Sequence, residues 1–484
     1  HARVEEYYGW LRAILSPMFG VFLARDVIFF YVCFEFTLIP MYFLIAIYGG
    51  SNRAAACTKF FLYTFAGSVI TLAGVIYVAW QYSLSAEAAG SWSFDIGTLT
   101  SFAQTMTPTQ QMWVLIALLS GFAVKVPLFP VHTWLPLAHT EAPTAGSVIL
   151  AGVLLKLGTY GFYRFVLPMT PDGLFVEGSF TWLSFIGIEF DFYVIQLIAG
   201  LSIVGILYAA LICWVQTDVK KLVAYSSVSH LGFCILGLMA LNPLGLQGSV
   251  LYMINHGLST GALFFFIGMI YGRYHTRDMD QLGGLAKKMP VWAFFMVFFT
   301  LASVGLPGLN GFVSEFLCLI AAFTANADNA QYPGVLGPWY AAIAGIGMIF
   351  AAMYLLYMVG KVVFGPVKTP GSSGGHDHHG HGHDDHASNL PTDLTPREIG
   401  VLAPLAILCL WLGFQPTPLM NAMQPSIDET LAVYPDRVRA MMPVAQQNEL
   451  ELKLDETASG TMRLANDEPR TTNNAAATEG QVDG

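Results

Sequence analysis

The chain has 484 residues, of which 55% are hydrophobic and only 11% are charged. Soluble domains carry about 25% charged residues, so this composition excludes a soluble globular protein, and it equally excludes a disordered or collagen-like chain. The net charge of −10 argues against a nucleic-acid-binding protein, whereas the mean hydropathy of +0.56 indicates a membrane protein.

Apolar segments long enough to cross a bilayer recur along most of the chain. A transmembrane helix needs about 20 mostly apolar residues, and the sequence predicts about eleven such helices in an all-α, polytopic membrane protein. In chain order, the expected spans are Tyr8–Ala24, Val27–Tyr48, Lys59–Tyr82, Gln111–Pro130, Ala145–Val166, Tyr193–Val215, Leu222–Leu241, Gly248–Tyr271, Val291–Phe323, Pro338–Phe364 and Ile399–Phe414.

Positive charge is concentrated in the connections that fall on one side if eleven spans alternate. Cytoplasmic loops of membrane proteins carry an excess of Lys and Arg. We therefore predict that three connections are cytoplasmic, and that the C-terminal tail lies on the opposite side. The basic residues in or beside these connections are Arg53, Lys59, Lys220, Lys221, Arg273, Arg277, Lys287 and Lys288.

Two of the expected spans are interrupted by proline and glycine. Residues 125–136 read KVPLFPVHTWLP, and residues 304–311 read VGLPGLNG. Backbone groups freed by such residues are tolerated in a bilayer only against protein or a water-filled cavity. The breaks fall in the fourth and ninth spans, five spans apart. Because five is an odd number, the second half would be inverted in the membrane relative to the first. Paired broken helices in inverted halves are typical of transporters. Two unrelated proline kinks are the alternative.

Four ionisable residues stand in the middle of apolar spans: Glu35, Lys125, Lys156 and Glu315. A charge in the bilayer costs a few kcal/mol or more, so each is a candidate functional group. A position at the membrane interface, reached by an extended side chain, is the alternative.

Polar residues in the later spans include His230 and His256, which we interpret as candidates for a proton path. The alternative is a buried histidine that is satisfied by a neighbouring hydroxyl. Phosphate-binding, nucleophile-triad and haem motifs are absent, and the six cysteines lack metal or disulfide spacing, so we expect them to be small buried hydrophobes. The chemistry that the spans offer is proton movement.

Two segments lie outside the membrane pattern. The Gly/Ser-rich stretch 371–388 could bind a metal or form a solvated flexible loop; its histidines are His376, His378, His379, His381, His383 and His386. Residues 425–484 carry eleven acidic and five basic side chains, so we expect an acidic polar tail.

The segments 34–44 (FEFTLIPMYFL), 124–156 and 305–316 (GLPGLNGFVSEF) resemble the proton-antiporter-type membrane subunits of respiratory complex I. Within that family of NADH:quinone oxidoreductase subunits, they resemble the M type, whose mitochondrial counterpart is subunit 4. The resemblance extends from about Tyr8 to Phe414. The family has fourteen spans, so we expect the first three to be absent here.

The resemblance implies two inverted five-helix repeats, residues 1–166 with a broken helix near 125–136 and residues 193–364 with a broken helix near 304–311. A His-rich cytoplasmic loop at 365–398, a last transmembrane helix at 399–414 and the tail at 425–484 complete the expected organisation. The resemblance also implies a role for each candidate residue in a proton relay. Glu35 and Lys125 would form a pair, Lys156 would be the central relay residue, and Glu315 would be the acid on the exit side. His230 and His256 would belong to the central polar axis.

The implied activity is proton translocation driven by quinone reduction elsewhere in the complex. Protons would pass from the cytoplasm through Lys125, gated by Glu35, and on to Lys156 before leaving by Glu315. No redox centre is expected in this chain, because other subunits bind NAD, FMN, iron–sulfur clusters and quinone.

Expected partners are other membrane subunits of the complex, especially adjacent antiporter-like ones, and the lipid of a bacterial inner membrane rather than a mitochondrial one. Two alternatives remain: a subunit of a cation/proton antiporter without electron transfer, in which a lysine usually replaces Glu315, and a purely structural membrane subunit.

Overall fold

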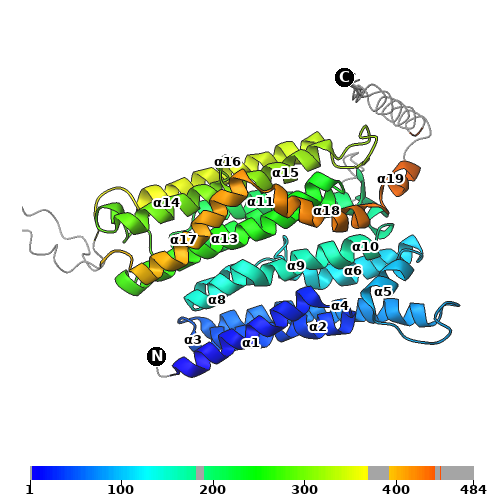
Figure 1. The fold of residues 1–484 in the computed structure, drawn as a ribbon, viewed down its shortest axis with the longest axis horizontal. Helices are drawn as coiled ribbons and strands as arrows, with labels where there is room; N and C mark the ends of the chain where they lie inside the picture. The colour runs from blue at the N-terminus through cyan, green and yellow to red at the C-terminus, as the bar shows by residue number, and fades with distance from the viewer. Residues whose placement is uncertain (1–2, 181–189, 369–391, 442–446, 448–484) are drawn as a thin grey trace, which may run out of the picture.

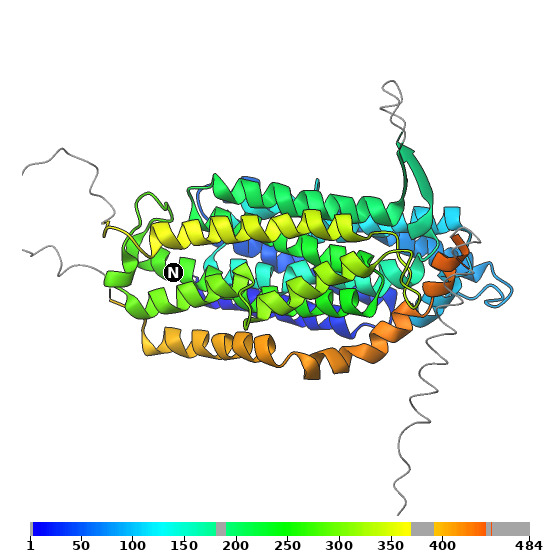
Figure 2. The same cartoon turned by 90° about the horizontal axis from the view of Figure 1, so that it is seen from above.

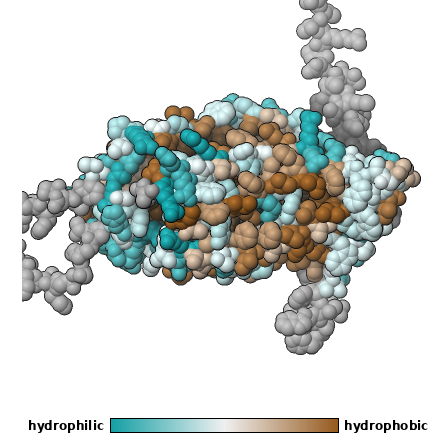
Figure 3. Space-filling model, turned by 90° about the horizontal axis from the view of Figure 1, so that it is seen from below, coloured by the Kyte–Doolittle hydropathy of each residue, from teal (hydrophilic) through white to brown (hydrophobic). Residues whose placement is uncertain are grey.

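Long, nearly parallel helices form the whole body of the protein (Figures 1 and 2). The computed structural model describes residues 3–180, 190–368, 392–441 and Gln447. Within these residues, eight helices are long and apolar enough to cross a membrane. Hydrophobic side chains gather over the middle of the face seen in Figure 3, and hydrophilic ones gather at its left end. The predicted helical, multi-spanning membrane fold is confirmed.

The first half of the chain supplies the blue to cyan helices in the lower part of Figure 1. Its helices are α1 (Val4–Leu23), α2 (Val27–Phe36), α3 (Leu38–Tyr48), α4 (Arg53–Ser83), α5 (Ile96–Ala103), α6 (Pro108–Lys125), α7 (Trp134–Glu141), α8 (Thr144–Ile149), α9 (Leu155–Gly161) and α10 (Leu167–Met169). A short 3₁₀ helix follows at Gly173–Phe175. The predicted spans in α1, in α6 and at Val291–Phe323 are helical, the last as two shorter helices, but are not among the eight, so the number eleven stays a prediction.

The second half supplies the green to orange helices, with α17 and α18 along one flank (Figure 2). Its helices are α11 (Val194–Trp214), α12 (Val219–Met239), α13 (Pro243–Tyr274), α14 (Pro290–Val304), α15 (Asn310–Thr324), α16 (Pro338–Val362), α17 (Pro396–Phe414), α18 (Thr417–Leu431) and α19 (Pro435–Met441), with a 3₁₀ helix at Leu285–Lys287. Helix α12 is buried over nearly its whole length, so it lies at the centre of this half. Strands β1 (Glu177–Phe180) and β2 (Phe190–Tyr193) pair antiparallel outside the spans.

Both predicted helix breaks are present. Helix α6 ends at Lys125, and eight residues without regular structure precede α7. Helix α14 ends at Val304, and the turn before α15 places Gly305 and Gly308 at φ values of +82° and +92°. Side chains disfavour this left-handed region, so the glycines allow the break.

Two predicted single helices have local irregularities. In Val27–Tyr48, Thr37 separates α2 from α3, because Pro40 has no N–H to donate to the carbonyl one turn earlier. The Thr37 hydroxyl donates to the Phe34 carbonyl oxygen over 2.7 Å. The rod from Thr144 to Met169 contains two π-helical turns, at Leu150–Leu154 and Phe162–Val166.

Lys220 does not lie in a loop: α12 begins at Val219, and Lys220 is 6% exposed in its first turn. The start of the expected tail, 425–441, lies in α18 and α19 and the turn between them, and it packs on the protein through Ile427 and Tyr434. The six histidines of the stretch 371–388 lie outside the described residues. The six cysteines, all within the described ranges, are buried and free, as predicted.

Candidate functional site

The four predicted mid-span charges lie on four different helices. Lys125, Lys156 and Glu315 are buried, with exposed fractions of 2%, 6% and 1%. Glu35 is half-buried on α2. Its Oε1 is buried and has no hydrogen-bond partner among the described residues. All four ionisable side chains are therefore at least partly withdrawn from solvent, and their charged forms are costly in such surroundings.

Lys125 ends α6 at the first helix break and points to the bend between α2 and α3. Its Nζ lies 3.5 Å from the Thr37 Oγ1 and 4.7 Å from the centre of the Phe34 ring. Phe34 and Thr37 flank Glu35 on the chain. The ion pairs found within the described ranges do not include Glu35 with Lys125, so the two charges are neighbours without direct contact.

Lys156 follows the first π-helical turn and contacts a residue of the second half. Its Nζ donates to the carbonyl oxygen of Ala151, five residues earlier in that turn. The same nitrogen lies 2.7 Å from Nδ1 of His256 on α13. Lys156, predicted as the central relay, and His256, predicted in the polar axis, are thus brought together, and the contact crosses from one half of the chain to the other.

The close approach of two glycines makes this contact feasible. A Cβ atom added to Gly257 would lie 2.9 Å from the carbonyl oxygen of Gly152, in the π-helical turn. A side chain at Gly257 would force α13 away from the turn that precedes Lys156.

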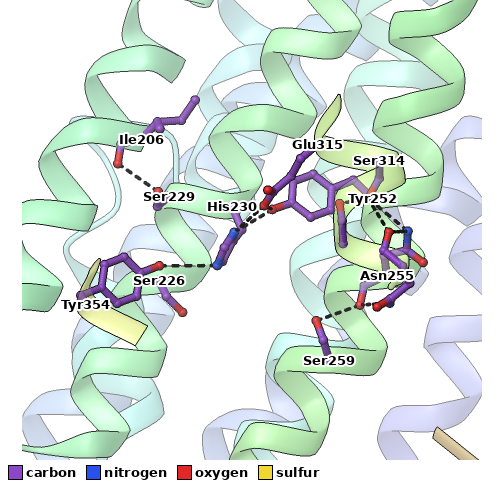
Figure 4. Close-up of polar contacts among 12 residues, drawn as sticks. Ile206, Ser226, Ser229, His230, Tyr252, Asn255, Ser259, Ser314, Glu315 and Tyr354 are labelled. Carbon is purple, nitrogen blue, oxygen red and sulfur yellow. Dashed lines mark hydrogen bonds and ion pairs between the residues drawn. The ribbon is translucent and has the colours of Figure 1, made fainter. Parts of the chain in front are cut away.

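His230 on α12 lies at the centre of the second polar group (Figure 4). Its Nδ1 is 2.7 Å from the Tyr252 hydroxyl and 3.2 Å from Oε1 of Glu315, and the Tyr252 hydroxyl donates to that same oxygen. On the other side of the ring, Nε2 is 3.5 Å from the Tyr354 hydroxyl. His230, Tyr252 and Glu315 therefore form one connected cluster from three helices.

The second helix break borders this cluster. Oε2 of Glu315 lies so close to Gly305 that a Cβ atom there would be 2.7 Å from it. Near the same break, the Asn255 side chain donates to the Asn310 carbonyl oxygen over 2.7 Å and to the Ser314 hydroxyl over 3.1 Å. These hydrogen bonds connect α13 to the start of α15, the helix that carries Glu315, and so help to fix the position of Glu315.

A narrow gap separates the two polar groups. It is lined by His230, Tyr252, His256, Ser259, Ser303 and Gly311 and has no room for a water molecule. The rings of His230 and His256 have their centres 5.8 Å apart. Of the residues that line the gap, two have a buried atom without a hydrogen-bond partner among the described residues: His256 Nε2 and Ser303 Oγ. The line from Lys156 to Glu315 is therefore complete except for one interval.

The sequence indicated the charged residues and histidines between Lys156 and Glu315, but Tyr252, Tyr354 and Ser303 were not predicted. A usable signal existed for Tyr252, because it precedes His256 by four residues and so shares its helix face. Tyr354 and Ser303 carry no such signal. As for metals, the residues that the structure describes hold no group of three or more His, Cys, Asp or Glu side chains placed to bind an ion.

Residues 24–337 match the family described as NADH:quinone oxidoreductase/Mrp antiporter, TM. NADH-quinone oxidoreductase subunit M from Rhodobacter capsulatus is 39% identical over 443 residues, which cover 89% of this chain and 76% of that protein. NADH-ubiquinone oxidoreductase chain 4 from Marchantia polymorpha is 37% identical over 413 residues, covering 85% and 72%.

Solved structures share the fold. A chain of respiratory complex I from Thermus thermophilus, solved with bound NADH, superposes with a TM-score of 0.71 at 30% identity, covering 88% of this chain and 79% of that one. A chain of the Mrp complex from Dietzia sp. DQ12-45-1b, at 21% identity and a TM-score of 0.66, covers 87% and 77% and shows the fold alone. The protein therefore belongs to the NADH:quinone oxidoreductase/Mrp antiporter membrane family, and within it to the group of subunit M and chain 4.

Proposed function

We propose that this chain is a proton-translocating membrane subunit of an NADH:quinone oxidoreductase. The observation that carries the proposal is the buried line of proton-exchanging side chains from Lys156 through His256 and His230 to Glu315. Ionisable groups inside membrane spans are costly to bury, so their presence there is by default explained by a function.

The chemistry follows from the contacts. A charged Lys156 can pass a proton to Nδ1 of His256, and the imidazole can release a proton from its opposite nitrogen, Nε2. That nitrogen borders the gap. On the far side, the proton is received by the cluster of His230, Tyr252 and Glu315. Transfer across the interval requires that the gap widen enough to hydrate.

Lys125 and Glu35 stand upstream in this proposal, on the cytoplasmic side of Lys156. Their separation leaves Lys125 beside the Phe34 ring and the Thr37 hydroxyl. A small shift at the α2–α3 bend would bring the carboxylate nearer the ammonium group or take it away. Glu35 would in this way control when Lys125 holds its proton.

The remaining assignments belong to the same proposal. Residues 1–166 and 193–364 are inverted repeats, each contributing one broken helix. Electron transfer and the binding of NAD, FMN, iron–sulfur clusters and quinone belong to other subunits. Adjacent antiporter-like subunits in a bacterial inner membrane are the partners.

Proton pumping by the assembled complex tests the proposal. We expect Lys156→Ala, Lys125→Ala and Glu35→Gln each to suppress pumping and to slow the coupled quinone reduction, measured as protons released per NADH oxidised in sealed vesicles. Lys287→Ala, at an exposed position, is the control. Full proton-to-electron stoichiometry in the Lys125 and Glu35 variants would reject the assignment, and a silent Lys156→Ala would favour a structural subunit.

A cation/proton antiporter without electron transfer is the second candidate, favoured by the Mrp family match and the shared fold. Glu315 argues against it, because the resemblance places a lysine at this position in such complexes. Co-purification separates the two: NADH dehydrogenase subunits accompany this chain only in the first case.

A further inference from the structure

Two basic side chains of the second half, the buried Lys220 and the partly exposed Arg277, bind the end of the broken helix of the first half. Helix α7 ends at Glu141, and the last carbonyls of a helix have no partner within the helix. The Glu141 carbonyl oxygen accepts from the backbone N–H of Gly50 over 2.9 Å. The carbonyl oxygens on either side, of Thr140 and Ala142, accept from side chains that lie far away in sequence.

Lys220 is the first of these donors. Its Nζ donates to the Ala142 carbonyl oxygen over 2.5 Å and lies 3.5 Å from that of Thr140. The side chain is buried at the start of α12. The next residue, Lys221, is exposed, so the two adjacent lysines have different surroundings and Lys221 can serve as a control.

Arg277, in the connection after α13, is the second donor. Its guanidinium donates to the Thr140 carbonyl oxygen over 2.7 Å, and its Nε lies 3.4 Å from the Asp218 carboxylate. Asp218 also caps α12, accepting from the backbone N–H of Lys220 over 2.7 Å. Lys220, Arg277 and Asp218 thus form one unit, which we call the α7 clamp.

Electrostatics favours this arrangement, because the C-terminal end of a helix carries partial negative charge. The clamp also reaches a relay residue through a short chain of contacts. At its other end, α7 is tied to α6 by the Trp134 Nε1–H, which donates to the Val124 carbonyl oxygen over 2.9 Å. The next residue is Lys125. A rigid two-turn helix therefore lies between the clamp and Lys125.

We infer that Lys220 and Arg277 are positioning residues that hold α7 against the second half and thereby set the place of Lys125 relative to Glu35. The inference rests on the proposed function, since it gives the clamp a role in the proton relay. In this role Lys220 acts as a fixed cation and does not itself pass protons.

The test uses the assembled complex in sealed vesicles. Lys220→Met removes the donor and keeps an unbranched chain of similar length, whereas Lys220→Arg keeps the cation. We expect Lys220→Met to lower the pumping rate about tenfold or more, because small misplacements of reacting groups have effects of this size. Lys220→Arg is expected to restore most of the rate, and Lys221→Met, the matched control, to leave it unchanged.

Lys220→Arg separates positioning from proton transfer, because arginine keeps its proton in proteins. A Lys220→Arg variant as impaired as Lys220→Met would overturn the inference, and so would a Lys220→Met variant with normal pumping. Arg277→Gln and Arg277→Lys repeat the comparison in case Lys220→Met does not assemble, with rescue expected only for lysine. Lys156→Ala, measured in parallel, distinguishes the failures: normal pumping there rejects the relay itself, whereas a silent clamp variant beside an inactive Lys156→Ala rejects the clamp alone.

Discussion

The two carboxylate oxygens of Glu315, the acid at the end of the proposed relay, have different surroundings. One carboxylate oxygen contacts both Tyr252 and His230, while the other lies against Gly305 and has no partner within the described residues. Buried polar atoms in proteins nearly always have a hydrogen-bond partner, so an atom without one calls for an explanation. A group that alternately gains and loses a proton provides it, because its partner need be present in only one of the two states.

Gly305→Ala tests how closely the break must fit Glu315. The new Cβ atom would meet Oε2 at 2.7 Å, and the residue would also pay about 1–2 kcal/mol for its left-handed backbone. We expect a marked loss of pumping in the vesicle assay, because the carboxylate must move away from His230.

Gly308→Ala is the matched control. Gly308 has a similar φ of +92°, but a Cβ atom there would meet only the Phe414 ring, at 3.5 Å. Backbone strain is thus common to both variants, and contact with Glu315 is not. Equal pumping by the two variants would mean that the fit to Glu315 is unimportant.

The residues of the proposed relay could be singled out in the sequence because each is an isolated polar group in an apolar span. Their contacts could not be predicted, although the spacing of Tyr252 and His256 gave a signal that the two share a helix face. Thr37, Tyr252 and Tyr354 are ordinary residues of membrane helices, and only the packing of α2, α13 and α16 turns their hydroxyls toward Lys125 and His230. The direct contact of Lys156 with His256 likewise depends on how two halves of the chain pack.

Among the helical elements, the π-helical turn Leu150–Leu154 has the clearest connection to the site. It frees the Ala151 carbonyl oxygen to accept from the Lys156 ammonium group. π-helical turns are rare and often occur at functional sites. The turn also carries Gly152, against which α13 packs through Gly257.

Gly257→Ala tests this packing. Its Cβ atom would lie 2.9 Å from the Gly152 carbonyl oxygen, and backbone atoms cannot move aside as a flexible side chain can. We expect α13 to shift, the contact of Lys156 with His256 to lengthen, and pumping to fall several-fold.

Gly272→Ala, on the same helix with open space around it, is the control and should pump normally. Alanine favours a helix over glycine by about 1 kcal/mol, so helix propensity alone would stabilise both variants. Normal pumping by Gly257→Ala would show that the close approach is not required.

Long apolar helices were predicted well: α11, for instance, spans Val194–Trp214 where Tyr193–Val215 was expected. Hydropathy reports apolar length, but it is insensitive to hydrogen-bond register, so the π-helical turns were not predictable. The β1–β2 hairpin was missed for a different reason, because four-residue strands outside the membrane leave no periodic signal.

On the scale of the whole molecule, the segment from α18 to α19 joins the two halves. The Tyr163 hydroxyl of the first half contacts the Ser426 hydroxyl over 3.0 Å, and Gln247 of the second half donates to Gln424 over 2.5 Å. Farther along, Arg437 pairs with Asp172 over 2.7 Å. The sequence did not predict that this segment packs on the protein. The average charge of residues 425–484 is acidic, and such an average does not reveal a short amphipathic helix at the start of the segment.

Tyr434→Phe measures what this segment contributes to stability. The buried Tyr434 hydroxyl donates to the Leu167 carbonyl oxygen over 2.6 Å, and burial raises the pKa of the phenol, which therefore remains a donor at physiological pH. Loss of the hydroxyl leaves a buried acceptor unpaired, so we expect a loss of about 1–3 kcal/mol, seen as a lower midpoint of thermal unfolding.

Tyr340→Phe, which removes a longer contact of 3.5 Å to the Gln196 carbonyl oxygen, should have a smaller effect. A Tyr434→Phe variant with an unchanged midpoint would mean that the segment rests on the protein without stabilising it.

The narrow gap that separates His256 from the cluster of His230, Tyr252 and Glu315 bears on how well the membrane keeps protons from leaking through. Protons hop only along unbroken hydrogen bonds, and here the chain of bonds is interrupted where no water molecule fits. In the proposed role of this chain, that interruption would stop protons from flowing back along the path between turnovers. Tight packing at this gap would keep the membrane insulating, and pumping would require the gap to open in step with the cycle.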